Sequence, residues 1–461
     1  AINLMAEDAG DLYGFTIDNC TIHGFRGLNS NRGKSSGGII ITILSDPDDS
    51  TKRVPTGIHD ITVTNCEMYN LGRSGFNFSS PWTTRRNENS HGDDWGSFDY
   101  GGYGDWYPCK NIYIANNIIH DIDGDGILID GCENVLVEHN TVYRCLKFTR
   151  MAVGMFNWNS DYTVFQYNEV YDTCPSDKDP KGNTYDGQGI EIDALNRDTL
   201  VQYNYSHNNR GGSLMWCNIN SERGFRGIYR YNIFENEGNI WGVVDWRPNH
   251  YDSAAYNNTF YIGKNTMSSK RWQIANSNGG NRAPNAKFVN NIFYSEDPIP
   301  FGSSLPGSTW SSNIFYNVTG APSDNNNQTV TDGSTLLADP GCGGNGKIND
   351  LGGYMLTADS PAIDAGETVT IPAIWNELKS LFKEKFSSEI GDDRDYFGNE
   401  IADGSPDIGA AEYGKADNAG AVLEKMTDPA LQQQKQELQA AIDAYQKDQS
   451  EENRKALEEA C

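Results

Sequence analysis

The chain has 461 residues, a formal net charge of -27 and a hydrophobic content of 37%. This acidity argues against nucleic acid as a partner, because phosphate binding needs a basic face, and against an acidic polysaccharide unless cations bridge it. No apolar run reaches transmembrane length, so we expect no membrane insertion. A neutral ligand fits this composition best.

A short pattern recurs along the chain: Asn, any residue, an apolar residue, then in most copies Tyr or His. Its copies begin at Asn117, Asn140, Asn168, Asn204, Asn232, Asn258, Asn291 and Asn313. A short alternating strand precedes each copy, and the connecting loops vary in length. A fixed ladder position with variable loops predicts an all-β solenoid, a parallel β-helix, in which the Asn side chains stack about 4.8 Å apart and bond along the axis.

Residues 121–126 have the sequence Asp-Ile-Asp-Gly-Asp-Gly, which is similar to the beginning of a calcium loop. The later acidic ligand found at EF-hand spacing is missing, and a strand follows at once. Two interpretations therefore stay open for Asp121, Asp123 and Asp125. They are turn residues, or they are ligands of a structural calcium ion. We expect the chemistry itself to require no cofactor.

A second set of strands, each following a Gly, precedes the Asn pattern by one strand. Aligned on that Gly, their fourth residues form the column Asp130, Trp158, Asp193, Trp216 and Trp246. We expect this column to face outward, where three Trp rings are costly unless something covers them. Sugar rings stack on Trp faces, so the column predicts a carbohydrate-binding surface. The loop at residues 80–108, rich in Trp, Tyr, Gly and Asp, is expected to form a wall beside it.

The stretch at residues 185–193 has a Gly-rich turn followed by a strand. Ile190 and Ile192 are predicted to face the core, and Glu191 and Asp193 to face solvent. Asp186 lies in the turn, seven residues before Asp193. Two carboxylates that converge outside a strand suit the cleavage of a glycosidic bond.

Two rival carboxylate pairs stay open. Glu191 and Asp193 share a strand face, about 6.7 Å apart, whereas Asp130 and Asp193 lie two coils apart, about 10 Å. The wider separation suits an inverting enzyme, and a closer pair suits a retaining one.

The pattern loosens from residue 320 to residue 413. Residues 360–366 and 406–413 look like the closing coils of bacterial surface β-helix proteins, and one helix is predicted between them, over residues 373–386. The tail is rich in Ala, Gln, Glu and Lys, and its helical spacing predicts two amphipathic helices. We therefore divide the chain into a β-helix catalytic domain at 1–416 and an α-helical C-terminal extension at 417–461.

Three features together resemble the lacto-N-biosidase glycoside hydrolases, right-handed parallel β-helix enzymes of gut bacteria. They are the Asp-Gly-Gln-Gly-Ile-Glu-Ile-Asp stretch at 186–193, the aromatic column, and the coils at 1–413. The resemblance implies an extracellular or cell-surface bacterial enzyme that releases lacto-N-biose from lacto-N-tetraose, a neutral oligosaccharide, with retention. It implies Asp193 as nucleophile and Asp186 as acid/base. Some members need an upstream domain or a separate chaperone to fold, so such a partner is expected here.

In such a mechanism Asp193 attacks the anomeric carbon while Asp186 protonates the leaving oxygen. Asp186 must hold its proton near neutral pH, and Glu191 is expected to supply the negative charge that helps it do so. Trp158, Trp216 and Trp246 are expected to stack on sugars. Arg150 is expected to bond a hydroxyl or acetamido group.

Two other functions stay open. A polysaccharide lyase needs a cation or an Arg/Lys cluster to neutralise a uronate carboxylate, and the aligned strand faces have Asp and Trp instead. A non-catalytic carbohydrate-binding surface module would keep the Trp column but has no need of the carboxylate pair.

Overall fold

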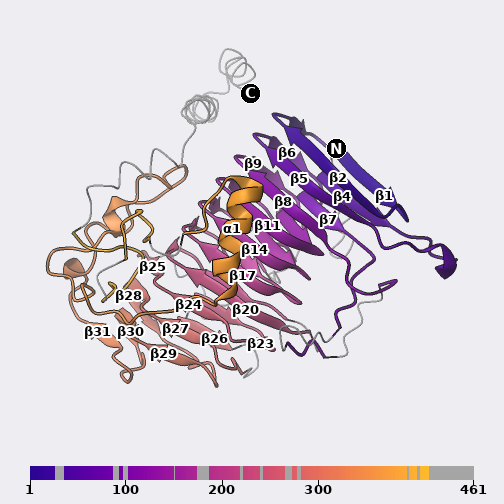
Figure 1. Cartoon of the computed structure of the whole chain (residues 1–461). Helices are drawn as coiled ribbons and strands as arrows, with labels where there is room; N and C mark the ends of the chain where they lie inside the picture. Colours follow the sequence, from indigo (N-terminus) through magenta and orange to yellow (C-terminus); the bar gives the residue numbers. More distant parts are fainter. Residues whose placement is uncertain are drawn as a thin grey trace, which may run out of the picture.

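The computed structural model describes residues 1–25, 36–86, 93–96, 102–149, 151–173, 186–218, 222–238, 242–264, 273–277, 282–391, 394–401 and 405–414. In these residues the chain winds into three long sheets that stack along one axis (Figure 1). Up to β28 (Ile292–Pro300), each coil gives a strand to sheet A, then to sheet B, then to sheet C, and the last coils add strands to sheets B and C only.

Sheet A contains β1 (Ile2–Glu7), β4 (Gly37–Leu44), β7 (Ser74–Ser79), β10 (Asp125–Asp130), β13 (Met155–Trp158), β16 (Ile190–Ile192), β19 (Leu214–Trp216), β22 (Val244–Trp246) and β26 (Ala275–Ser277). Sheet B contains β2 (Asp11–Asp18), β5 (Gly57–Thr64), β8 (Cys109–Ala115), β11 (Cys132–Glu138), β14 (Asp161–Gln166), β17 (Arg197–Gln202), β20 (Gly224–Arg230), β24 (Ala254–Tyr256), β27 (Lys287–Val289) and β29 (Thr309–Ser311), with β23 (His250–Tyr251) beside β20. Sheet C contains β3 (Thr21–His23), β6 (Glu67–Leu71), β9 (Ile118–Ile122), β12 (Thr141–Tyr143), β15 (Glu169–Tyr171), β18 (Tyr205–His207), β21 (Ile233–Glu235), β25 (Thr259–Ile262), β28 (Ile292–Pro300), β30 (Ile314–Thr319) and β31 (Gln328–Val330). Short 3-10 turns occur at Ser50–Lys52, Gly333–Thr335 and Gly352–Tyr354, and the helix α1 spans Ile374–Phe386.

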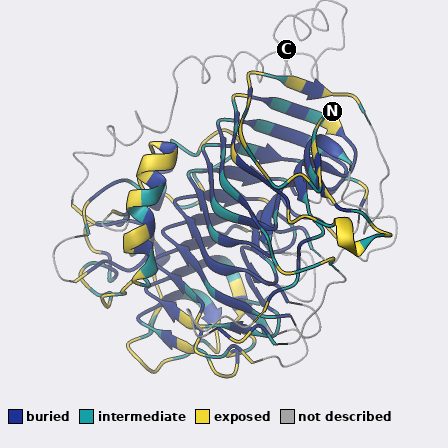
Figure 2. Cartoon of the chain, turned by 45° about the vertical axis from the view of Figure 1, so that its right-hand side comes forward, coloured by how far each residue is buried: buried dark blue, intermediate teal, exposed yellow. Residues whose placement is uncertain are grey.

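The strands of neighbouring coils pair in parallel within each sheet. The predicted parallel β-helix is therefore confirmed. Alternate residues of each strand point into a continuous apolar core, as Ile127 and Ile129 do on β10, both 0% exposed. Figure 2 shows that the stacked strands are largely buried. The fold thus leaves binding to side chains on the outer sheet faces and to the loops.

The Asn ladder runs along the corner between sheets B and C as predicted. Each ladder Asn is buried, and its side-chain amide donates to the Oδ1 of the Asn one coil further on, at 2.9–3.0 Å. The backbone N–H of each Asn donates to the same oxygen. The coil before Asn117 carries Cys66, whose N–H donates to the first Oδ1 at 2.9 Å.

We predict that Asn168→Ala lowers the free energy of unfolding by about 1–3 kcal/mol, because it leaves buried partners unbonded. In the native protein the Asn168 amide donates to Val137 O, Gln166 O and Asn204 Oδ1. Urea unfolding followed by circular dichroism measures the change. The exposed Asn376 of α1 supplies the control, since Asn376→Ala removes the same group from solvent. Equal losses in the two variants would contradict a supporting role for the ladder.

The predicted helix between the closing coils is confirmed as α1. Its apolar side, formed by Trp375, Leu378, Phe382 and Phe386, packs on outward side chains of sheet B such as Leu200. Figure 1 shows α1 lying across the middle strands of that sheet, and Figure 2 shows its other side exposed. The helix therefore covers this part of sheet B.

The segment that follows β31 covers sheet C in a similar way. Tyr354 donates its hydroxyl to Glu235 at 2.7 Å, and the Gly344 N–H donates to the hydroxyl of Tyr205 at 2.9 Å. The helix α1 covers the middle of sheet B, and the segment after β31 covers this part of sheet C. The predicted extension at 417–461 lies outside the described residues, so the domain division stays a prediction.

Glu237 lies buried at the corner between sheets C and A, 1% exposed. It accepts hydrogen bonds from Ser206 Oγ at 2.6 Å and Asn209 Nδ2 at 2.5 Å, yet burial raises its pKa to about 8. The folded state therefore binds the Glu237 proton more tightly than the unfolded state does. Its contribution to stability is full below about pH 4.5 and is lost as the pH rises towards 8.

We predict that Glu237→Gln removes this pH dependence. The difference in unfolding free energy between variant and wild type should grow in favour of the variant by about 1.4 kcal/mol per pH unit between pH 5 and 8. Glu377→Gln, on an exposed position of α1, is the control. A constant difference across this pH range would contradict a protonated Glu237.

Candidate active site

The motif at 186–193 forms a turn and a strand on the outer side of sheet A, near the middle of the helix. Gly187 has a φ of +108°, a conformation that favours glycine, and its N–H donates to Ala152 O at 3.1 Å. A Cβ on Gly189 would lie 2.2 Å from Ser206 Oγ. One glycine therefore makes the turn that carries Asp186, and the other lets the strand pack closely against the neighbouring coil.

The strand end fixes Asp193. Its backbone N–H donates to Asn157 O at 3.2 Å, and its Oδ1 accepts the N–H of Ala194 at 2.7 Å. Ligand atoms of Asp193, Glu191 and Cys217 all lie within 4.8 Å of one another. These contacts hold the predicted nucleophile rigidly inside a small polar cluster.

Asp186 joins the same cluster through Arg247, whose Nη2 lies 3.6 Å from Asp186 Oδ1. The charges of Asp193 and Asp186 both raise the pKa of Glu191. The structure thus brings together the three acidic residues of the motif that the sequence singled out. It also adds a cation that the sequence interpretation did not include.

Glu191 points outward as predicted but is only 4% exposed. Burial first, then the charges of Asp193 and Asp186, raise its pKa well above the ordinary value, against Arg247 and a hydrogen bond from Cys217. Burial and the two nearby carboxylates therefore favour the neutral form of Glu191. The expectation that Glu191 faces solvent is wrong, and desolvation with two like charges disfavours the negative charge it is expected to supply.

Arg247 and Cys217 complete the cluster. Arg247 Nη1 lies 3.5 Å from Cys217 Sγ, and its Nε lies 3.4 Å from Asp245 Oδ2. Burial, with the nearby Asp193, raises the pKa of the Cys217 thiol well above its usual value. The thiol therefore stays protonated, which excludes it as a nucleophile at neutral pH.

The placement of Trp216 and Trp246 in the outward column is wrong. Both are 0% exposed, belong to the interior core and lie against each other with ring centroids 4.9 Å apart. The register pairs Trp216 with Ile192, an inward residue, and not with Asp193. A slip of one residue moves a side chain to the opposite face of a sheet, and such a slip separates the Gly-based alignment from the structure.

An additional residue after the glycine causes this slip. The N–H groups of Ser213 and Leu214 both donate to Val243 O, at 2.9 and 3.0 Å, so two residues of one coil meet one of the next. The inward row therefore continues with Leu214, and the outward column continues with Cys217 and Arg247 after Asp193. One signal in the sequence indicates the observed register. The apolar residues Val244 and Trp246 alternate with the charged residues Asp245 and Arg247, and the alignment on glycines overlooks this.

We predict that Trp216→Ala lowers the free energy of unfolding by about 3–5 kcal/mol, because it leaves a cavity in the core. Trp158→Ala is the matched variant, since Trp158 lies on the outward column of the same sheet and is half-buried. Its loss should be clearly smaller in the same urea titration. An equal or smaller loss for Trp216 would contradict the register.

The predicted substrate contacts that remain are Asp130, Trp158 and Arg150. Asp130 and Trp158 lie side by side in the outward column, with Trp158 packed against Leu128 and Phe156. Arg150 lies outside the described residues. Together with Asp193, Asp130 and Trp158 therefore form the described outer surface that runs from the cluster towards the N-terminal coils.

Two of the three aspartates at 121–125 form ion pairs with basic side chains. The carboxylate of Asp121 contacts Lys147 Nζ at 2.7 Å and also Arg144, and Asp125 pairs with Arg73 at 2.6 Å. Among the described residues, the only His, Cys, Asp or Glu group close enough to share an ion is the one around Asp193. These contacts favour ion-pairing roles at this turn, and calcium binding stays a prediction.

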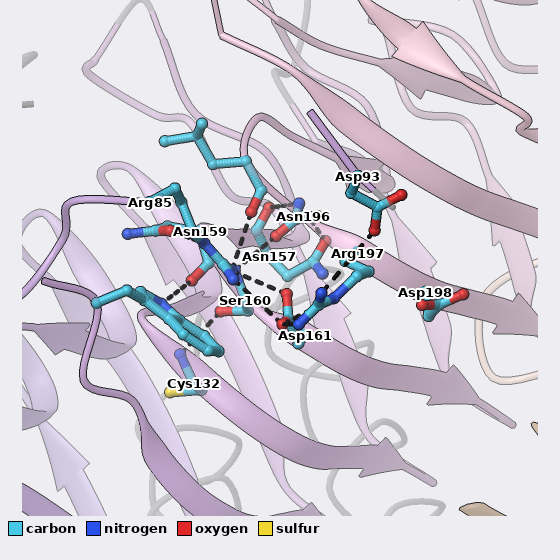
Figure 3. Close-up of polar contacts among 12 residues, drawn as sticks. Arg85, Asp93, Cys132, Asn157, Asn159, Ser160, Asp161, Asn196, Arg197 and Asp198 are labelled. Carbon is cyan, nitrogen blue, oxygen red and sulfur yellow. Dashed lines mark hydrogen bonds and ion pairs between the residues drawn. The ribbon is translucent and has the colours of Figure 1, made fainter. Parts of the chain in front are cut away.

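The loop at 80–108 is anchored beside this surface by a buried ion network. Arg85 donates to Asp161 at 2.8 and 3.1 Å, and Figure 3 shows Arg197 reaching the same carboxylate from the other side. Arg226 also donates to Asp93 through both Nη atoms at 2.8 Å.

Aromatic contacts tie the same loop to the outward column. The Arg85 guanidinium lies 3.6 Å from the ring centroid of Trp106 and 4.5 Å from that of Trp95. Trp158 packs against the cluster that contains Trp95. The described parts of the loop therefore form the predicted wall beside Trp158.

Comparison with known proteins agrees with this architecture. The family described as "Right handed beta helix region" matches residues 100–260. A curated lacto-N-biosidase of Bifidobacterium longum subsp. longum is 26% identical over 441 residues, which cover 88% of this chain and 26% of that protein. The chain resembles the lacto-N-biosidase family. It spans about a quarter of the length of that relative.

Two solved structures are among those to which the chain has some similarity. A lacto-N-biosidase of glycoside hydrolase family 136 from Eubacterium ramulus has a TM-score of 0.43 and 22% identity, with 60% of this chain and 44% of that chain covered. A pectate lyase has a TM-score of 0.39 and 11% identity, with 89% and 96% covered. In the described part of the chain, no helix has the length and apolarity to span a membrane.

Proposed function

We propose that the chain is a retaining glycoside hydrolase that releases lacto-N-biose from lacto-N-tetraose-type human milk oligosaccharides or related glycans. One observation carries the proposal: Asp186 and Asp193, from a single coil, belong to one polar cluster on the outer face of sheet A. The resemblance to a curated lacto-N-biosidase over 88% of the chain supports the choice of substrate.

The proposed reaction has two steps. Asp193 attacks the anomeric carbon, the glycosidic bond breaks, and the leaving oxygen takes the proton of Asp186. A water molecule then gives a proton to Asp186 and attacks the glycosyl ester, which restores both residues. Two inversions at one carbon give a product with retained configuration. The rigid anchoring of Asp193 suits the nucleophile, and the position of Asp186 on a turn suits a group that must reach the leaving oxygen.

Trp158 and Asp130 are the residues we propose for contact with the sugars on one side of Asp193. The Trp158 ring gives an apolar face for stacking, and Asp130, adjacent to it, gives hydrogen-bond acceptors. We keep Arg150 as a proposed contact to a hydroxyl or acetamido group.

We also propose an extracellular or cell-surface location in a bacterium, as the lacto-N-biosidase resemblance suggests. An upstream domain or chaperone that assists folding is part of the same proposal. A structural calcium ion at Asp121, Asp123 and Asp125 is a separate proposal. Dialysis against a chelator tests it, since loss of calcium would lower the melting temperature. No cofactor is proposed for the reaction.

A polysaccharide lyase is the second candidate, and Arg247 is the observation that favours it. A lyase needs a cation near its base to neutralise a uronate, and Arg247 is a cation in the cluster. However, Asp186 and Asp245 already lie against its guanidinium. The net charge of the chain also disfavours an acidic polymer. A binding module without catalysis is the third candidate.

Incubation with lacto-N-tetraose, pectin and alginate in parallel separates these candidates. We expect a disaccharide from lacto-N-tetraose, detected by chromatography, and no change in the two acidic polymers. A rise in ultraviolet absorbance from an unsaturated uronate would instead identify a lyase. Glycan binding without any product would identify a binding module.

A further inference from the structure

Arg247 contacts a different acidic or thiol group with each nitrogen of its guanidinium. Nε lies 3.4 Å from Asp245 Oδ2, Nη1 lies 3.5 Å from Cys217 Sγ, and Nη2 lies 3.6 Å from Asp186 Oδ1. Its backbone N–H donates to Trp216 O at 3.0 Å, which fixes the end of β22. The side chain is 15% exposed, so its position is set by the protein.

The surroundings of Asp186 decide what this arrangement does. The charged and titratable groups of the cluster are Glu191 and Asp193 on the same coil, Cys217 on the next coil, and Asp245 and Arg247 on the coil after that. Burial raises the pKa values of both Glu191 and the Cys217 thiol, which favours their neutral forms. Among these groups of the described residues, Arg247 is the one that carries a positive charge.

In the first proposed step, negative charge moves from one aspartate to the other. Asp193 loses its charge when the bond from its Oδ to the anomeric carbon forms. Asp186 gains a charge when its proton passes to the leaving oxygen of the breaking glycosidic bond. A cation beside Asp186 stabilises the state after this transfer.

We propose that Arg247 is a positioning residue for this reaction, which holds the Asp186 side chain in place and stabilises the carboxylate that Asp186 becomes when it gives up its proton. Asp245 and Cys217 hold the guanidinium in turn. This inference rests on the proposed glycosidase function. The planar fork of arginine is required, because a lysine ammonium is a single point that cannot contact all three groups together.

The test compares Arg247→Met and Arg247→Lys with wild type on nitrophenyl and dinitrophenyl lacto-N-biosides. Without Arg247, we expect the basic limb of the pH profile of kcat/KM to move up by about one to three pH units. A positive charge beside a carboxyl group lowers the pKa of that group by about this amount, and its removal reverses the effect. The second step should slow, since Asp186 must then act as an ionised base. Arg247→Lys should restore the limb in part and the rate poorly.

Arg144→Met is the matched control. Arg144 also ion-pairs with an aspartate, Asp121, but it follows β12 in sheet C, away from the cluster. Its profile should keep the wild-type basic limb. A purely structural role for Arg247 would lower melting temperature and active fraction and leave the limb in place, which would overturn the inference.

A second readout does not depend on turnover. Carbon-13 labelling of aspartate carboxyl groups allows the Asp186 signal to be assigned by its loss in Asp186→Asn. Its titration midpoint should rise in Arg247→Met, and an unchanged midpoint would overturn the inference. If wild type cleaves no lacto-N-bioside, the proposed function fails, while this titration still decides the role of Arg247.

Discussion

Asp193→Asn is expected to lower kcat/KM on lacto-N-tetraose by at least about 10⁴-fold, because an amide cannot form the glycosyl ester on which both steps depend. The substitution preserves shape, and the Oδ1 that accepts the Ala194 N–H has an amide counterpart. The variant should therefore fold, bind the substrate and show a melting temperature close to that of wild type. Disaccharide release over long incubations measures the residual rate.

Asp252→Asn is the control for this loss. Asp252 is exposed, lies before β24 in sheet B and has a φ of +53°, a conformation that Asn tolerates. Its activity should equal that of wild type. Appreciable turnover by Asp193→Asn would remove the nucleophile from this position and with it the covalent mechanism.

Asp186→Asn is expected to show a loss that depends on the leaving group. A dinitrophenyl lacto-N-bioside needs little protonation, so the first step should largely survive on it, whereas lacto-N-tetraose should lose about 10²–10⁴-fold. The second step should slow, because no base remains to activate water. A glycosyl-enzyme should therefore accumulate and appear as a burst of released dinitrophenol.

Azide provides the complementary result. The anion needs no general base, so it should attack the accumulated ester and restore turnover of the activated substrate. The product should be a glycosyl azide with the configuration of the substrate. Equal losses on both substrates, with no rescue by azide, would contradict the acid/base role of Asp186.

The repeat made most of the fold predictable. Ladder residues such as Asn168 must be buried and bonded in every coil, so their pattern is strong in the sequence and the structure bears it out. The helix α1 was predicted within one residue of its start because its amphipathic spacing interrupts the repeat. These are local signals that repeat or contrast with their surroundings.

The site was predictable only in part, because it depends on register across coils. Asp186, Glu191 and Asp193 lie in one continuous motif and were found. Arg247 was missed, since one additional residue before β19 and one before β22 change which residues face outward. An alignment on the glycines hides this insertion, which only the alternation of Val244 and Trp246 with charged neighbours marks in the sequence.

Buried polar networks were the other gap. Arg85 and Asp161 are 76 residues apart in the sequence and meet only when the loop folds back on the coils. The burial that raises the pKa of Glu191 likewise follows from packing that no local pattern reveals. Both features depend on the three-dimensional placement of charges.

The configuration of the first product tests the central claim most directly. Proton NMR spectra recorded within the first minutes of lacto-N-tetraose hydrolysis distinguish the two anomers of the released disaccharide before they interconvert. The proposed roles of Asp193 as nucleophile and Asp186 as acid/base predict a product with retained configuration. An inverted product would contradict the covalent mechanism and would favour Asp130 and Asp193, two coils apart, with a water molecule between them.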